Sequence, residues 1–166
     1  TVEAILNIAK QKNKPNFILI LDGIEDPHNF GSIIRVAECL GVDGIIISKN
    51  RACPVNDTVS KVSAGAIEHM KIAKVTNINT EIERLKEQNI WVYACELGGI
   101  DLDTADLSGN IAIVMGSEGK GVSSLTKKIC DGVVSMQMYG RVNSLNVSVA
   151  TGIVLYEIVR RNRFDK

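Results

Sequence analysis

Aromatic side chains are scarce in this sequence, which holds three Phe, three Tyr and one Trp among 166 residues. They are scattered, so the chain offers no base-stacking surface of the kind that an RRM or an OB fold presents. Apolar runs are also short, and none approaches the ~20 residues needed to cross a bilayer. Residues 1–15 lack the basic-then-apolar pattern of a secretory signal. These absences favour one soluble globular domain with no membrane partner.

Metal-ligating side chains are few and badly spaced. The cysteines are Cys39, Cys53, Cys95 and Cys130, with no Cys-x-x-Cys pair, and only two His residues could join them. A zinc site is therefore not expected, and no metal is predicted. Cys39 and Cys95 lie within apolar patterns, so we predict that both are small buried hydrophobic residues. Unpaired thiols of this kind indicate the reducing cytoplasm.

Charge of one sign does not dominate, because 19 Lys and Arg balance 19 Asp and Glu. The distribution is less even: residues 81–125 carry 3 basic and 8 acidic side chains, and residues 126–166 carry 7 basic and 3 acidic. A wholly basic coat for nucleic acid is excluded, but a local basic patch is not.

What is present is an alternation of strands and helices. Phe17 to Leu21 is a continuous apolar run, typical of a strand buried on both faces. Thr80 and Glu83 have capping-box spacing and predict a helix start. Gly41 is a natural helix stop. The predicted strands are 17–21, 44–47, 70–75, 90–95, 111–115 and 133–138, and the predicted helices are 31–40, 57–67, 80–88, 123–130 and 144–161. This order predicts an α/β fold with a mostly parallel sheet and helices on both faces.

Three polar loops each follow a predicted strand: 26–31, 116–121 and 141–150. Ligands of open α/β sheets bind beyond the carboxyl ends of the strands, so these loops are the candidate site. If the first loop is only a turn followed by a helix start, Asn29 is the candidate helix cap. Arg35 follows on a largely apolar helix, where a charge needs a partner or a function.

The second loop, Gly116-Ser-Glu-Gly-Lys-Gly121, fails two tests for phosphate binding. A Walker A loop needs Lys and then Ser or Thr after the last Gly, but Val122 and Ser123 follow. A dinucleotide fingerprint needs a third Gly where Ser124 stands. An NTPase and a nucleotide-dependent dehydrogenase are therefore disfavoured. What remains is a backbone-exposing loop with one carboxylate, Glu118.

The third loop begins a helix with residues that do not favour helices. Asn146 and Ser148 are poor helix formers, so caps or other contacts must hold them. Ser148, Ala150 and Gly152 keep this helix thin, which suits the close approach of another backbone.

Together, in this order, the three loops resemble the signature motifs of the SpoU (TrmH) branch of the SPOUT methyltransferases. The first matches through Asn29, Gly31 and Arg35. The second matches as Ile113-Val-Met-Gly-Ser-Glu-Gly-Lys-Gly121, and the third as Asn143-Ser-Leu-Asn-Val-Ser-Val-Ala150. The segments 61–66 and 68–69 are similar to RlmB-type enzymes, which methylate a guanosine 2′-oxygen of 23S rRNA.

The resemblance implies a fold, a cofactor and partners that composition could not show. Family members carry a C-terminal deep trefoil knot, bind S-adenosylmethionine in a bent shape and act as homodimers on RNA. The residues placed at the cofactor by the resemblance are Leu97, Gly116, Ser117, Met136 and Leu145. Those placed in catalysis are Asn29, Arg35, Glu118, Ser144 and Asn146. No metal is implied.

The resemblance puts Arg35 at the ribose 2′-hydroxyl. A guanidinium is hard to deprotonate, so we interpret Arg35 as a cationic clamp that stabilises the developing alkoxide. The proton acceptor stays open between a phosphate oxygen, Arg35 itself and Glu118. Asn29 would orient the arginine, while Ser144 and Asn146 would set the third loop. His28 and His69 are candidate bases, but neither has a positioned partner.

RlmB-type proteins usually carry a small N-terminal domain that grips RNA, and this sequence has no counterpart to it. We therefore interpret residues 1–166 as a single methyltransferase domain and expect the main RNA-binding region to lie elsewhere. Large-subunit rRNA is the expected substrate. Two alternatives stay open: methylation of tRNA ribose by the same chemistry, and a catalytically silent RNA-binding module.

Overall fold

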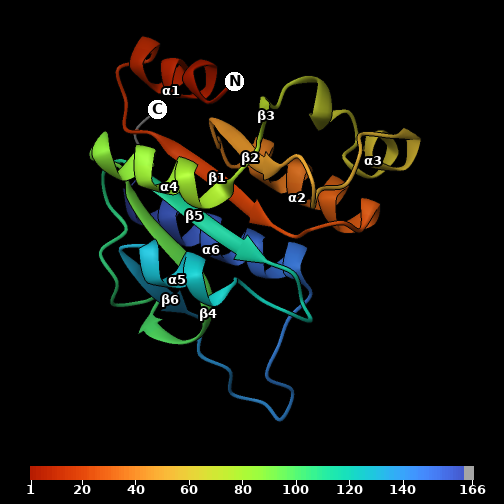
Figure 1. The fold of residues 1–166 in the computed structure, drawn as a ribbon. Coiled ribbons are helices and arrows are strands. Elements are labelled where there is room, and N and C mark those ends of the chain that lie inside the picture. Colours follow the sequence, from red (N-terminus) through yellow and green to blue (C-terminus); the bar gives the residue numbers. More distant parts are fainter. Residues whose placement is uncertain (163–166) are drawn as a thin grey trace.

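The computed structural model describes residues 1–162, which form a six-stranded parallel sheet covered by helices on both faces (Figure 1). The strand order is β3-β2-β1-β5-β4-β6. The strands are β1 (Phe17–Asp22), β2 (Gly44–Ser48), β3 (Ile72–Val75), β4 (Trp91–Asp101), β5 (Ile111–Gly116) and β6 (Gly132–Ser135). The helices are α1 (Val2–Gln11), α2 (Pro27–Cys39), α3 (Asp57–Val62), the 3₁₀ turn η1 (Ala66–Glu68), α4 (Ile78–Glu87), α5 (Ser124–Ile129) and α6 (Val147–Asn162). The predicted α/β class is confirmed.

Two hydrophobic cores lie on opposite faces of the sheet. Helices α2, α3 and α6 cover one face, and α1, α4 and α5 cover the other. Strand β1 serves both cores, because Phe17, Leu19 and Leu21 belong to the first and Ile18 and Ile20 to the second. Successive side chains of a strand point to opposite faces, so a strand buried on both sides must be apolar throughout.

The strand order brings the loops after β1 and β5 side by side. Leu21 pairs with Met115 and Asp22 with Gly116, so these two central strands end level with each other. From β1 the chain moves outward through β2 to β3, then crosses over to β4 and returns to β5. This reversal is a topological switch point, the place where open α/β sheets bind ligands.

Strand β4 is longer than the sequence predicts, and its pairing slips. Cys95 and Ile100 both pair with Val134 of β6, so residues 96–99 bulge out of the ladder. The sequence pattern predicts an acidic, Gly-containing loop or short elements for 96–110. The bulge leaves its own side chains beside the carboxyl end of β5.

Two helices, α2 and α4, begin earlier than the sequence predicts. Helix α2 begins at Pro27, and its cap is Asp26, whose carboxylate accepts from the His28 and Asn29 backbone N–H groups at 2.8 and 3.4 Å. Asn29 is therefore within the first turn and is not the cap. Likewise Asn77, not Thr80, caps α4. Several side chains near each start can cap a helix, and the backbone angles decide which one does.

Two further differences concern the ends of predicted elements. The predicted helix 57–67 is broken after Val62, because Ala64 and Gly65 both have positive φ. The sequence pattern predicts no element for the first residues, where α1 buries Val2, Ile5 and Ala9. No helix among residues 1–162 is long and apolar enough to cross a membrane.

Candidate active site

A pocket with an empty volume of about 850 Å³ opens at the carboxyl ends of β4, β5 and β6. Its wall comes from the β4 bulge, the loop after β5 and the long loop between β6 and α6. The residues predicted to hold the cofactor all line it: Leu97, Gly116, Ser117, Met136 and Leu145. The structure therefore brings them together, and their binding of a cofactor stays a prediction.

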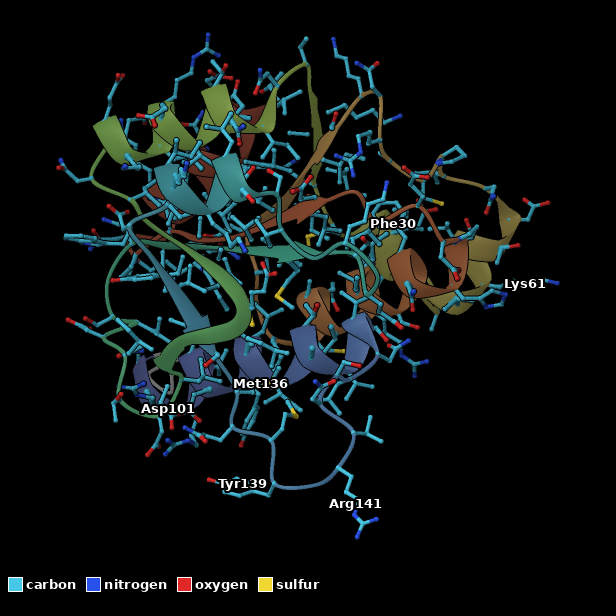
Figure 2. The ribbon with its side chains drawn as sticks, turned by 60° about the horizontal axis from the view of Figure 1, so that its bottom comes forward. Phe30, Lys61, Asp101, Met136, Tyr139 and Arg141 are labelled. Carbon is cyan, nitrogen blue, oxygen red and sulfur yellow. The ribbon has the colours of Figure 1, made fainter. Side chains whose placement is uncertain are left out.

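The inner wall of the pocket is apolar and its rim is charged. Met115, Val147 and Ala150 are buried beneath it, while the carboxylates of Glu96 and Glu118 lie at its edge. Figure 2 shows Met136 near the root of the β6–α6 loop, with Tyr139 and Arg141 at its projecting tip. An apolar floor with a few polar groups is typical of a small-molecule site.

Gly116 closes the loop that forms one side of the pocket. A Cβ on Gly116 would lie 2.2 Å from the carbonyl carbon of Gly121, too close for any side chain. The Gly121 N–H donates to the Ser117 carbonyl at 2.7 Å, so the loop folds tightly on itself. The absence of a side chain at Gly116 thus allows the loop to close on itself.

Glu96 is a pocket residue that sequence reasoning missed. Its Oε2 accepts from the Val122 N–H at 3.2 Å, and its Oε1 lies 3.5 Å from Lys127 Nζ. Glu96 therefore ties the β4 bulge to the loop after β5. The only signal in the sequence is its place directly after an apolar strand, a signal shared by many residues.

The pocket is lined by one thiol, and its raised pKa keeps it protonated at neutral pH. Cys95 is partly buried at the end of the first part of β4, and burial raises its pKa to about 11. The prediction of a buried residue is wrong for Cys39, which is exposed as the last residue of α2. The buried cysteines are Cys53 and Cys130, and all four are free.

A polar cluster joins all three predicted loops. The Asn146 Nδ2 donates to Asn29 Oδ1 and to Glu118 Oε1, both at 3.0 Å, and the Val147 N–H donates to the same Glu118 oxygen at 3.2 Å. Asn146 Oδ1 accepts from the Ser148 N–H at 2.9 Å. Asn146 therefore caps α6, which begins three residues after the predicted start at Ser144.

A groove with an empty volume of about 1050 Å³ adjoins the pocket. Ser117, Glu118 and Val147 line both cavities, so the two share a wall. The groove is also lined by Asn29, Asn146 and the loop 23–28. Asn29, Glu118 and Asn146 thus lie at the groove, whereas Ser144 lies at the rim of the pocket.

Arg35 is exposed on α2 and lines neither cavity. Within residues 1–162 no hydrogen bond or ion pair of its side chain is present, and its catalytic role stays a prediction. The next residue, Val36, lines a shallow apolar depression between α2 and α6 with Val149, Ile153 and Tyr156. Arg35 therefore stands beside an exposed apolar face.

Of the two histidines, only His28 lies at the site. It lines the groove beside Glu25 and Asp26, whereas His69 is exposed on the turn after η1. In the described part of the chain, no three side chains of His, Cys, Asp or Glu are grouped to hold a metal ion.

Comparisons with known proteins agree with this geometry. Residues 16–156 match the model of the SpoU rRNA Methylase family. YacO of Bacillus subtilis, which its name assigns to the TrmH family of tRNA/rRNA methyltransferases, is 44% identical over 162 residues, 96% of this chain and 65% of that protein. The chain thus spans slightly less than two thirds of that relative.

Solved structures with a bound cofactor are similar as well. The SpoU methyltransferase AviRb from Streptomyces viridochromogenes, in complex with AdoMet, has a TM-score of 0.81 at 27% identity, over 89% of this chain and 58% of that chain. An AdoMet-bound rRNA methyltransferase from Sinorhizobium meliloti has a TM-score of 0.81 at 29% identity, over 89% and 57%. S-adenosylmethionine, the cofactor expected from the sequence, is thus the ligand of both relatives.

Proposed function

We propose that this chain, which belongs to the SpoU rRNA Methylase family, transfers the methyl group of S-adenosylmethionine to a ribose 2′-oxygen of RNA. The observation that carries the proposal is the wall shared by pocket and groove, formed by Ser117, Glu118 and Val147. A methyl donor in the pocket and an acceptor in the groove would meet there. Group transfer requires this kind of juxtaposition, because both reactants must be held in near-attack geometry.

The chemistry of the pocket lining suits S-adenosylmethionine. Met115, Met136 and Leu145 supply an apolar wall for the adenine ring and the methionine chain. The carboxylates of Glu96 and Glu118 suit a ligand that carries a sulfonium and an ammonium, since opposite charges attract strongly at a partly dry site.

When bound, S-adenosylmethionine supplies an electrophilic methyl group that the 2′-oxygen attacks in line, while the sulfur leaves and the 2′-proton is lost. The residues of the chain must position the hydroxyl and accept that proton. Asn146 holds Asn29 and Glu118 together through one amide, so the groove wall is already organised. The bonds from Asn146 and Val147 both reach Glu118 Oε1, which leaves Oε2 to orient a substrate hydroxyl or the arginine.

Arg35 enters this scheme through a second copy of the chain. Val149, Ile153 and Tyr156 are exposed on α6, the helix that the site residue Asn146 caps. We infer that a homodimer covers this apolar face and brings the partner subunit's Arg35 to the groove. There its guanidinium would clamp the phosphate and ribose and stabilise the developing alkoxide.

The preferred acceptor is a guanosine of large-subunit rRNA. Glu25 and Asp26 line the groove, and a carboxylate can accept hydrogen bonds from the N–H groups of guanine. The likeness of 61–66 and 68–69 to RlmB-type enzymes supports the same choice. Methylation of tRNA ribose is the second candidate, because the names of curated relatives cover both tRNA and rRNA.

We further propose that the segment from β5 to α6 is threaded as a deep trefoil knot. The support is the convergence of 95–97, 115–121 and 136–147 on one pocket. The described residues would then belong to one methyltransferase domain. Cytoplasmic action fits the four free cysteines, because free thiols persist in a reducing compartment.

Two experiments test the proposal. Titration calorimetry with S-adenosylmethionine should show saturable binding, and a folded protein that binds none would favour a silent RNA-binding module. Mapping of 2′-O-methyl sites in rRNA and tRNA from cells lacking the gene should reveal one lost mark, which the full-length enzyme restores. A lost mark in tRNA would select the second candidate, and no lost mark would contradict the activity.

A further inference from the structure

A polar cavity of about 620 Å³ empty volume lies at the carboxyl ends of β1, β2 and β3. It opens on the face of the sheet that α4 and α5 cover, because Asn77 and Ser123, the caps of those helices, line it. Every lining residue except Ile78 has a polar or charged side chain. None of these residues lines the pocket or the groove.

Among the described residues, Arg51 is the one cationic side chain that lines this cavity. It is held by an ion pair and is still accessible to a ligand. Its Nη1 lies 3.7 Å from Asp22 Oδ1, and half of its side chain (52%) is exposed against 11% for Asp22. Asp22 is itself fixed, because its Oδ2 accepts from the Ser123 N–H at 3.2 Å. A guanidinium has five N–H donors, so one ion pair leaves most of them for a ligand.

The guanidinium also lies at the boundary between this cavity and the groove. Gly23 lines the groove, and a Cβ on Gly23 would lie 2.6 Å from Arg51 Nη2. Arg51 therefore packs directly on the backbone that forms the edge of the groove. A chain molecule that leaves the groove over Gly23 would meet the guanidinium first and the polar cavity next.

The remaining walls divide into a fixed part and an open part. Thr126 Oγ1 donates to Asn79 Oδ1 at 2.6 Å, which fixes the side next to α5. On the opposite side, the side chains of Asn50 and Thr76 are exposed and form no hydrogen bond within the described residues 1–162. Amide and hydroxyl groups of this kind can pair with ribose hydroxyls and base edges.

We propose that this cavity is a subsite for the nucleotide adjacent to the methylated one, with Arg51 on the phosphate between the two. The inference rests on the proposed function, since it assumes that the groove takes the acceptor nucleotide. Guanidinium and phosphate form paired charge-assisted hydrogen bonds, and single-stranded RNA can splay neighbouring bases into separate sites. Asp22 is a positioning residue that holds the arginine.

The test compares Arg51→Gln with a matched control, Arg84→Gln. Arg84 is also exposed and also paired with a carboxylate, Glu81, at 2.8 Å, but it lies on α4 outside the cavity. Binding of a labelled single-stranded RNA oligonucleotide to the full chain is measured by fluorescence anisotropy over a series of salt concentrations. Arg51→Gln should weaken binding about tenfold and lower the salt slope by about one, as expected for one phosphate contact.

Arg84→Gln should bind like the unchanged protein, and Arg51→Lys should keep the salt slope. Equal effects of the two Gln variants, or no RNA binding by the unchanged protein at low salt, would overturn the proposal. Competition by inorganic phosphate as strong as by RNA would also overturn it, because the site would then be a general anion site. Thermal melting of Arg51→Gln checks that the variant is folded.

A second readout separates this inference from the proposed function. With rRNA from cells lacking the gene as substrate, Arg51→Gln should raise the KM for RNA about tenfold and leave the affinity for S-adenosylmethionine unchanged. If the unchanged protein methylates RNA and Arg51→Gln has no effect on KM, only the subsite is refuted. If the unchanged protein neither binds S-adenosylmethionine nor transfers a methyl group, the proposed function fails.

Discussion

The two halves of one sheet edge have opposite character. Beyond β4, β5 and β6 the pocket has an apolar wall of Met115, Met136 and Leu145, whereas the cavity beyond β1, β2 and β3 is polar except for Ile78. Both lie at strand ends, so topology alone does not set the kind of ligand. The difference comes from the segments that leave the strands: the bulge of β4 and the β6–α6 loop bring apolar side chains to one half, whereas helix caps and polar loop residues line the other. The apolar half suits a small cofactor, and the polar half suits a nucleic acid.

The largest expected effect is the loss of methyl transfer in Arg35→Ala. The variant should lose about 1000-fold in kcat, since removing one charge-stabilising group at a developing oxyanion costs up to this factor. Calorimetry should show unchanged binding of S-adenosylmethionine, because Arg35 does not line the pocket. Near-normal turnover would remove Arg35 from the mechanism, and Lys10→Ala on α1 is the control for a lost surface cation.

In the pocket beyond β4, β5 and β6, the largest loss of cofactor affinity is expected from a substitution of Gly116. Gly116→Ala forces a Cβ against the Gly121 backbone and should lower cofactor affinity by about 2–3 kcal/mol, or roughly 100-fold. Gly119→Ala in the same loop is the matched control, because nothing lies within 4 Å of its Cβ and its φ is not positive. Calorimetry measures both. An equal loss in the two variants would contradict the role given to Gly116.

The hydrogen bonds that join α2 to the loop after β5 through Asn146 should be lost in Asn146→Ser. A serine keeps a capping oxygen for α6, so the free energy of unfolding should change by less than about 1 kcal/mol. The shorter side chain cannot hold Asn29 and Glu118 together, and methyl transfer should fall about tenfold. Urea unfolding and single-turnover kinetics report the two quantities separately. A large loss of stability with normal transfer would show that Asn146 acts only as a cap.

The last prediction, a loss of stability at alkaline pH, concerns the thiol in the apolar pocket. Burial raises the pKa of Cys95 to about 11 from its ordinary 9.0, so the unfolded chain ionises this thiol first as the pH rises. The associated stability is complete below pH 9 and is lost between about pH 9 and pH 11, by about 1 kcal/mol per pH unit. Urea unfolding of Cys95→Ser should show a shallower fall over this range, whereas Cys39→Ser, at an exposed site, should follow the unchanged protein.

The sequence predicted which candidate residues lie together more accurately than it predicted where the helices begin and end. The convergence of Asn29, Glu118 and Asn146 is expected of polar loops placed after parallel strands, because those strand ends share one edge. The capping residues Asp26 and Asn77 were missed, since several polar residues compete near each helix start and only the backbone angles select one.

Long-range packing explains the features that the sequence could not reveal. A Cβ on Gly31 would lie 2.8 Å from the Val62 Cβ, so this glycine allows α3 to pack on α2, although its place in the sequence is typical of a ligand loop. Glu96 joins the site only because the β4 register slips. Arg51 reaches the polar cavity through its pairing with Asp22, a residue of a different strand end. A pattern in one segment does not record such contacts.

The slip in β4 also has a consequence for how this site can be altered. Val134 pairs with both Cys95 and Ile100, so the four residues between them make no ladder contacts that the sheet requires. Within this segment Glu96 is tied to the loop after β5, and a Cβ on Gly99 would lie 2.3 Å from the Val133 carbonyl oxygen. The exposed Leu97 is therefore the position that can change while the six strands keep their order. Libraries confined to it should therefore yield variants that accept sulfonium donors with larger alkyl groups, on a scaffold that folds as before.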